Sequence, residues 1–76
     1  MRELVESITR RIVDHPDQVK LTEVTGEQTV ILELRCNAKD VGKVIGKNGR
    51  VVAALRTLLT ALAQKQGKRA VLEVVE

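Results

Sequence analysis

The sequence predicts a small α+β domain in which helices cover one face of a three-stranded sheet. Three observations predict it: two β-rich runs meet at a glycine turn, a third β-rich run closes the chain, and the other segments have the apolar spacing of amphipathic helices. The chain has 76 residues and contains no Phe, Tyr or Trp. We therefore expect one domain over residues 1–76, with a thin core of Val, Leu, Ile and Ala.

The first element is expected to be an amphipathic helix over residues 2–13. Its apolar residues recur at three- and four-residue spacing: Leu4, Val5, Ile8 and Ile12. Pro16 ends the helical pattern, because proline disfavours helical backbone at the preceding His15. No second histidine or activated nucleophile accompanies His15, so it is interpreted as a turn residue.

Two strands are expected next, over residues 19–25 and 29–36. Gly26 and Glu27 between them suit a two-residue type II′ hairpin turn. In the second strand one set of residues alternates with another, so that one face is directed to the core: Val30, Leu32, Leu34 and Cys36. Cys36 is the single cysteine. It is interpreted as a small, buried residue at a strand end, and the absence of a possible intramolecular disulfide fits a reducing compartment.

A short helix, a glycine loop and a long helix should follow. Asn37 and Asp40 have the spacing of a capping box that opens the short helix, whose inward residues are Val41, Val44 and Ile45. The long helix should run from after Gly49 to about Gln66, with Gly67 as its C-cap. Its predicted inner face consists of Val52, Leu55, Leu58, Leu59 and Leu62. Residues 70–75, AVLEVV, are expected to form the last strand.

Positive charge is concentrated around the glycine loop. Residues 35–56 carry a net charge of +5, from six basic residues against Asp40 alone: Arg35, Lys39, Lys43, Lys47, Arg50 and Arg56. The two glycines at positions 46 and 49 allow the backbone conformations and close approach that other residues cannot provide. The loop also leads into a helix N-terminus, which attracts phosphate. These features together predict a polyanion-binding loop.

The stretch VIGKNGRVVAAL, residues 44–55, resembles the KH-domain pattern of an aliphatic pair, Gly-x-x-Gly and a following aliphatic helix. The expected element order, α-β-β-α-α-β, is that of type II KH domains. In length and loop position the whole chain is similar to the small bacterial single-domain KH proteins of the KhpA family. The resemblance implies that Gly46, Lys47, Asn48 and Gly49 clamp the backbone of single-stranded RNA. It further implies an aliphatic groove formed by Val41, Val44 and Ile45, with Ile31, Glu33 or Arg35 opposite.

We therefore expect a single-stranded RNA-binding protein that acts as an RNA chaperone or post-transcriptional regulator. Lys39, Lys43 and Arg50 would add phosphate contacts. Because no aromatic ring is present to stack on bases, sequence preference should be loose. The family resemblance and the widely apolar long helix together predict a homodimer or a heterodimer with a longer KH-containing protein. No apolar run is long enough to span a membrane, so a cytoplasmic location is expected.

Three other functions have less support in the sequence. A nucleotide hydrolase is disfavoured because GKVIGK, residues 42–47, has the wrong glycine spacing for a phosphate loop, and Asn48 stands where a metal-binding hydroxyl is needed. No catalytic dyad, metal cluster or cofactor motif is recognisable. A helix-turn-helix DNA-binding module would place polar base-reading residues after Arg50, where the sequence is VVAAL. A protein–protein adaptor module remains compatible with the sequence and with RNA binding.

Overall fold

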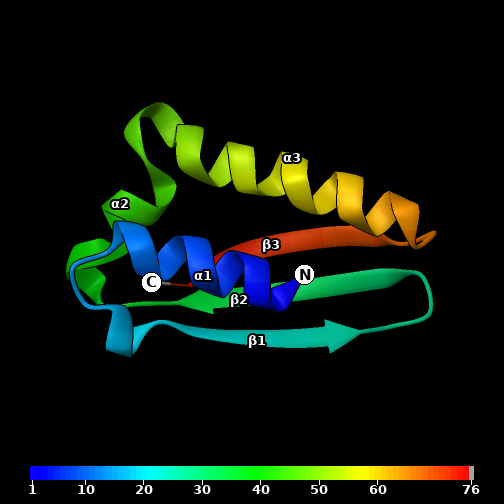
Figure 1. Ribbon diagram of the computed structural model, residues 1–76, viewed down its shortest axis with the longest axis horizontal. Coiled ribbons are helices and arrows are strands. Elements are labelled where there is room, and N and C mark those ends of the chain that lie inside the picture. Colours follow the sequence, from blue (N-terminus) through cyan, green and yellow to red (C-terminus); the bar gives the residue numbers. More distant parts are fainter. Residues whose placement is uncertain (76) are drawn as a thin grey trace.

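The computed structural model describes residues 1–75. Its main elements follow the expected order: α1 Arg2–Ile12, β1 Lys20–Thr25, β2 Thr29–Arg35, α2 Val41–Ile45, α3 Arg50–Lys65 and β3 Arg69–Val75. Short 3₁₀ turns occupy Pro16–Gln18, Ala38–Asp40 and Lys47–Gly49. The three strands form a mixed sheet in the order β1-β2-β3, with β1 antiparallel and β3 parallel to β2 (Figure 1). The predicted α+β fold is confirmed.

The helices share one face of the sheet. Val30, Leu32 and Leu34 of β2 are 2 %, 0 % and 0 % exposed, and they belong to one buried cluster with side chains from all three helices. Side chains alternate along a strand, so the other β2 residues lie on the opposite, open face. α3 extends from the glycine loop to the hairpin end of the sheet (Figure 1).

The hairpin turn differs from the prediction by one residue. Thr25 pairs with Val30, and the N–H of Gly26 donates to the carbonyl of Thr29 at 2.7 Å. Glu27 and Gln28 are therefore the two turn residues, and Gly26 does not have the positive φ that a type II′ turn would require. The predicted Gly26-Glu27 turn is wrong because the register that buries alternate β2 residues fixes the position of the turn.

The buried stripe of α1 is not its most apolar one. Val5 and Thr9 are both 0 % exposed, whereas Leu4 and Ile12 are 39 % and 37 % exposed. Val13, just after the helix, continues the stripe at four-residue spacing and is also in the core. A threonine thus takes a core position that the sequence pattern assigned to aliphatic residues.

We expect Thr9→Val to stabilise the protein. The Thr9 hydroxyl is buried and has no hydrogen-bond partner among residues 1–75. Valine keeps the shape and removes the unpaired polar atom, which should raise stability by about 1 kcal/mol and the melting temperature by roughly 5 °C. Thermal melting measures this, with the exposed Thr57→Val as control. A lower melting temperature for Thr9→Val would show that the hydroxyl has a partner.

The core side of α3 is also narrower than predicted. Val52, Leu55, Leu59 and Ala63 are buried, but Leu58 and Leu62 are 47 % and 38 % exposed, so their assignment to the inner face is wrong. Repeats of three and four residues place the small Ala63 inward and rotate Leu58 and Leu62 towards solvent. The C-cap prediction is confirmed, since Gly67 has a φ of 70° and the N–H of Lys68 donates to the carbonyl of Ala63 at 2.8 Å.

Candidate nucleic-acid interface

The loop between α2 and α3 contains three residues with unusual backbone conformations. Gly46 has φ 79° and ψ 170°, Asn48 has φ 56°, and Gly49 has φ 72°. The Gly46 conformation is one that glycine adopts almost exclusively, and asparagine is among the few other residues that tolerate the left-handed region. The residues GKNG thus match the backbone they form position by position.

Steric crowding by Val51 also requires glycine at position 46. A Cβ atom at this position would lie 2.5 Å from Cγ2 and 2.8 Å from the backbone nitrogen of Val51. The loop therefore folds tightly against the first turn of α3. A Cβ atom at Gly49 would meet no neighbouring atom within 4 Å, so the positive φ alone explains that glycine. Hydrogen bonds from the N–H of Gly46 to the carbonyl of Gly42 (2.9 Å) and from the N–H of Gly49 to the carbonyl of Gly46 (3.1 Å) fix the path.

The tip of the loop presents donors and positive charge to solvent. Lys47, Asn48 and Arg50 are exposed. The backbone N–H groups of Lys47 and Asn48 have no backbone acceptor within residues 1–75. They lie beside the N-terminus of α3, where the helix dipole is positive. From residue 41 to 72 the sequence has seven Lys or Arg and no Asp or Glu. This arrangement can bind a phosphate group.

The other three predicted cationic residues differ in their exposure and in their ion-pair partners. Lys39 is exposed in the 3₁₀ turn before α2. Lys43 is exposed on α2, but its ammonium forms an ion pair with Asp14. The hydrogen bond from Lys43 to Asp14 raises the pKa of the lysine. Arg35 lies on the open face of the sheet and pairs with Glu33 at 3.7 Å. The structure thus does not bring Arg35, Ile31 or Glu33 to the helix side, where α2 and the loop lie.

The aliphatic groove implied by the family resemblance is reduced at α2. Val44 is 0 % exposed and packs in the core, so it offers no surface to a base in this conformation. Val41 is 8 % exposed. Ile45 is partly buried and is the α2 aliphatic residue with the most accessible side chain. Val44 therefore anchors the residues before the loop to the core, and Ile45 is the α2 residue that can contact a ligand.

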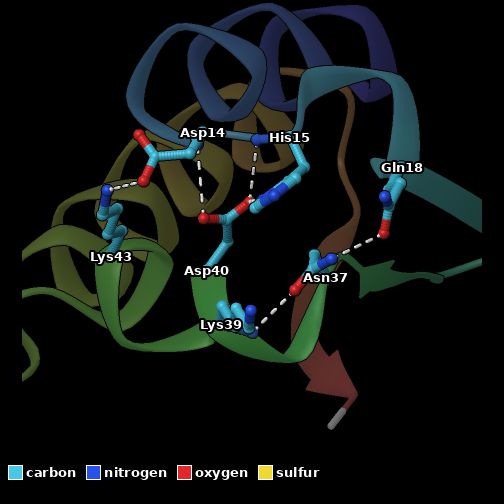
Figure 2. Close-up of polar contacts among 7 residues, drawn as sticks. All are labelled: Asp14, His15, Gln18, Asn37, Lys39, Asp40 and Lys43. Atoms are coloured by element: carbon cyan, nitrogen blue, oxygen red, sulfur yellow. Dashed lines mark hydrogen bonds and ion pairs between the residues drawn. The ribbon is translucent and has the colours of Figure 1, made fainter.

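A buried carboxylate anchors the start of α2 (Figure 2). Asp40 is fully buried and accepts hydrogen bonds from the N–H groups of Asp14 (3.2 Å) and His15 (3.0 Å). Nδ1 of His15 lies 3.0 Å from Oδ2 of Asp40 and donates to the ionised carboxylate. Asn37 accepts from the N–H of Lys39 at 2.8 Å and donates to Gln18 at 2.8 Å. The segment after α1 is thereby tied to the segment that leads into the loop.

Asp40 therefore has a role other than the predicted one. Asn37 does cap the turn, but the Asp40 side chain does not return to it, so the capping box is only half formed. Burial alone would raise the pKa of Asp40. The hydrogen bonds from the His15 side chain and from the two N–H groups outweigh burial and hold the pKa below its ordinary value. Burial, and the nearby Asp40 charge, raise the pKa of the Cys36 thiol.

Sequence reasoning missed this anchor, although one signal was present. Asp40 is the single acidic residue among residues 35–56, and neither α2 nor the loop contains another. An isolated acid in a basic segment is a candidate for a specific structural partner. His15, identified as a turn residue, is indeed in the turn and is one of those partners.

No helix in the described part of the chain is long and apolar enough to cross a bilayer. Likewise, residues 1–75 contain no cluster of three or more His, Cys, Asp or Glu side chains arranged to bind a metal ion.

The α-β-β-α-α-β order, the mixed sheet and the Gly-x-x-Gly loop between α2 and α3 define a KH domain of type II. The chain belongs to the KH-domain family of KhpA and KhpB, whose model, "KhpA/KhpB, KH domain", matches residues 2–74. It is 50 % identical to the RNA-binding protein KhpA of Aquifex aeolicus over 76 residues, which cover 100 % of this chain and 96 % of that protein.

Two further relatives are similar along nearly their whole length. The RNA-binding protein KhpA of Clostridium acetobutylicum is 51 % identical, over 99 % of this chain and 100 % of the relative. That of Borreliella burgdorferi is 49 % identical, over 97 % of this chain and 90 % of the relative. No solved structure matches the chain significantly.

Proposed function

We propose that this protein binds single-stranded RNA through the loop Gly46–Arg50 and acts as an RNA chaperone or post-transcriptional regulator in the cytoplasm. The observation that carries the proposal is the exposed GKNG turn, in which the backbone N–H groups of Lys47 and Asn48 have no backbone acceptor and lie beside the cationic side chains of Lys47 and Arg50. The relatives' name, RNA-binding protein, supports the choice of RNA. We propose no catalytic step.

The proposed binding mode follows from the groups at the loop. The N–H groups of Lys47 and Asn48 donate to phosphate oxygens, and Lys47 and Arg50 add charge attraction. Gly46 and Gly49 lack side chains and let the RNA backbone approach the protein backbone. Ile45 provides apolar contact to a base. Because the chain has no aromatic residue, bases are held without stacking on rings, and sequence preference is loose.

We expect single-stranded RNA to bind more tightly than duplex RNA or DNA, with an affinity that falls as salt rises. Each neutralised phosphate on a single strand contributes a slope of about −0.7 to log K against log salt. Contacts from Lys39, Lys47 and Arg50 would give a slope of about −2. Lys43 adds less because Asp14 already neutralises it. Fluorescence anisotropy at four salt concentrations measures the slope. A preference for duplex DNA would support the helix-turn-helix alternative instead.

We further propose that the protein self-associates or pairs with a longer KH-containing protein. Four large apolar side chains on α1 and α3 are more than a third exposed: Leu4, Ile12, Leu58 and Leu62. Between the two helices lies a surface hollow of about 290 Å³ whose lining is almost wholly aliphatic: Ile8, Val51, Ala54, Leu55 and Leu58, with Arg50 at its rim. Exposed apolar surface of this kind is typical of an interface. The family name, which joins KhpA and KhpB, supports a KH-containing partner.

Leu58→Glu is expected to convert the associated protein to a monomer. Leu58 is 47 % exposed, so a charge there is tolerated by the fold but disfavoured in an apolar interface. Analytical ultracentrifugation at high micromolar concentration, with Thr57→Glu as a control of equal charge, measures the change. If the wild-type protein is monomeric at that concentration and also ignores the candidate partner, the proposed interface is wrong.

A further inference from the structure

The exposed side of α2 leads directly into the glycine loop. Gly42 and Lys43 are exposed and precede Gly46 by four and three positions, so they lie on the side of the helix that continues into the loop. Gly42 does not have a positive φ, and a Cβ atom there would meet no neighbouring atom within 4 Å. Glycine destabilises a helix, and neither backbone strain nor packing requires it at this position. The missing side chain leaves the surface beside Lys43 open to a ligand held at the loop.

Lys43 is already paired within the protein. Its ammonium donates to Oδ2 of Asp14, which lies in the segment after α1 and precedes it by 29 positions. The two side chains are 45 % and 67 % exposed, so a dissolved anion can reach the pair. An ion pair at the surface contributes little net stability, because water and salt screen it. An incoming phosphate can therefore open this pair at small cost.

The buried anchor at Asp40 fixes the position of Asp14. The backbone N–H of Asp14 donates to Oδ1 of Asp40 at 3.2 Å, whereas its side chain extends to Lys43 (Figure 2). Asp40 is fully buried, so the backbone at Asp14 is restrained by a bond in the protein interior. Less conformational entropy is then lost when the Asp14 carboxylate pairs with Lys43. Asp14 is thus a pre-positioned anion beside α2.

The helix that precedes Asp14 does not account for a negative charge at this position. α1 ends at Ile12 and has Arg10 and Arg11 in its last turn. Positive charge is favoured near the C-terminus of a helix, and negative charge is disfavoured there. The favourable electrostatic contact of the Asp14 carboxylate is therefore the one with Lys43.

A phosphate and Asp14 have the same requirement at Lys43. Both present anionic oxygens that accept hydrogen bonds from the ammonium. The two anions also repel each other, whether the carboxylate leaves or shares the ammonium with the phosphate. Lys43 therefore contributes less to phosphate binding than its position beside the loop would otherwise allow.

We propose that Asp14 is an internal competitor for RNA phosphate at Lys43 and thereby limits the affinity of the loop for single-stranded RNA. The inference rests on the proposed function and concerns the regulation of the same site. Because Asp14 is attached to the protein, it recaptures Lys43 whenever a phosphate leaves, which favours release of the RNA. Without the carboxylate, Lys43 becomes an additional phosphate contact.

The test compares Asp14→Asn with wild type for binding of a short, fluorescently labelled single-stranded RNA of mixed sequence. Asparagine has the shape of aspartate and keeps the backbone N–H that donates to Asp40. Asp17→Asn is the matched control, since it removes the same charge from an exposed residue of the turn Pro16–Gln18. Asp14→Asn should bind several-fold more tightly than the control, with a slope of log K against log salt more negative by about 0.7. Melting curves check that both variants are folded.

A double-mutant cycle shows whether Asp14 acts through Lys43. Lys43→Gln should cost little affinity in the wild-type background, where Asp14 already occupies the ammonium. In the Asp14→Asn background the same substitution should remove the gain in affinity and return the salt slope to the wild-type value. A purely long-range charge effect would instead make the cost of Lys43→Gln equal in both backgrounds.

Two results overturn the inference while the proposed function stands, because wild type binds the RNA in both. One is an Asp14→Asn variant with the same affinity and salt slope as Asp17→Asn. The other is an equal cost of Lys43→Gln with and without Asp14. A wild-type protein that does not bind single-stranded RNA overturns the proposed function, and the inference with it.

Discussion

Replacing Asp40 with alanine should lower the melting temperature by roughly 10 °C, because two backbone donors and the His15 ring lose their acceptor in the protein interior. The Asp40 side chain is 1 % exposed. It accepts hydrogen bonds from His15 and Asp14, which precede it in the sequence by 25 and 26 positions. Thermal circular dichroism measures the shift. Asp17→Ala is the control, since Asp17 is exposed in the neighbouring turn. Equal melting temperatures for Asp40→Ala and wild type would show that the anchor is not formed.

The same carboxylate makes stability depend on pH. The pKa of Asp40 is lower in the folded protein than its ordinary value of 3.8. Its contribution is therefore complete above about pH 5 and is lost as the pH falls through 3.8 towards the lowered folded value. Asp40→Asn should be less stable than wild type at pH 7 and should lose less stability on acidification across that window. Denaturant titrations at several pH values give both slopes. A steeper acid slope in the variant would contradict the assignment.

The double variant Lys47→Asp/Asn48→Asp should lose most RNA binding, by about tenfold or more, because two carboxylates would face the phosphates. Its fold should be retained. Both side chains are exposed, Gly46 and Gly49 are unchanged, and aspartate tolerates the left-handed backbone of position 48. Anisotropy with single-stranded RNA measures affinity, and melting curves monitor folding.

A control with the same change in charge separates local from general repulsion. Lys20→Asp/Gln28→Asp replaces an exposed lysine and an exposed amide on β1 and the hairpin. It should retain most of the affinity. If the loop variant melts like wild type and binds RNA equally well, the loop is not the clamp.

Local patterns predicted most of the fold. The order of elements, the alternation in β2 and the glycine C-cap at Gly67 each depend on a few neighbouring residues, and each is confirmed. The rotation of the helices about their own axes depends instead on packing. The apolar periodicity of α3 did not reveal that Ala63 rather than Leu62 faces the core, and that of α1 did not reveal buried Thr9.

In the candidate site, too, local sequence patterns predicted some features and contacts between distant segments determined others. The backbone of residues 46–49 follows from glycine and asparagine at the positions that need positive φ. The local patterns also turned Val44 inward and placed Arg35 on the strand face opposite the core, and the structure agrees with both. The position of Lys43 beside Asp14, in contrast, depends on a contact between distant segments. Similarly, nothing local to Asp40 specifies its bonds to residues 14 and 15. Such contacts arise only when the segment after α1 packs against the start of α2.

The most direct test of RNA binding at the loop is a nuclear magnetic resonance titration of the ¹⁵N-labelled protein with short single-stranded RNA. The N–H groups of residues 46–50 should show the largest chemical-shift changes, with smaller changes at Ile45, and the open-face strand residues should remain unaffected. Saturating shifts on the open face of the sheet or around Leu58, with residues 46–50 unchanged, would contradict the proposed clamp.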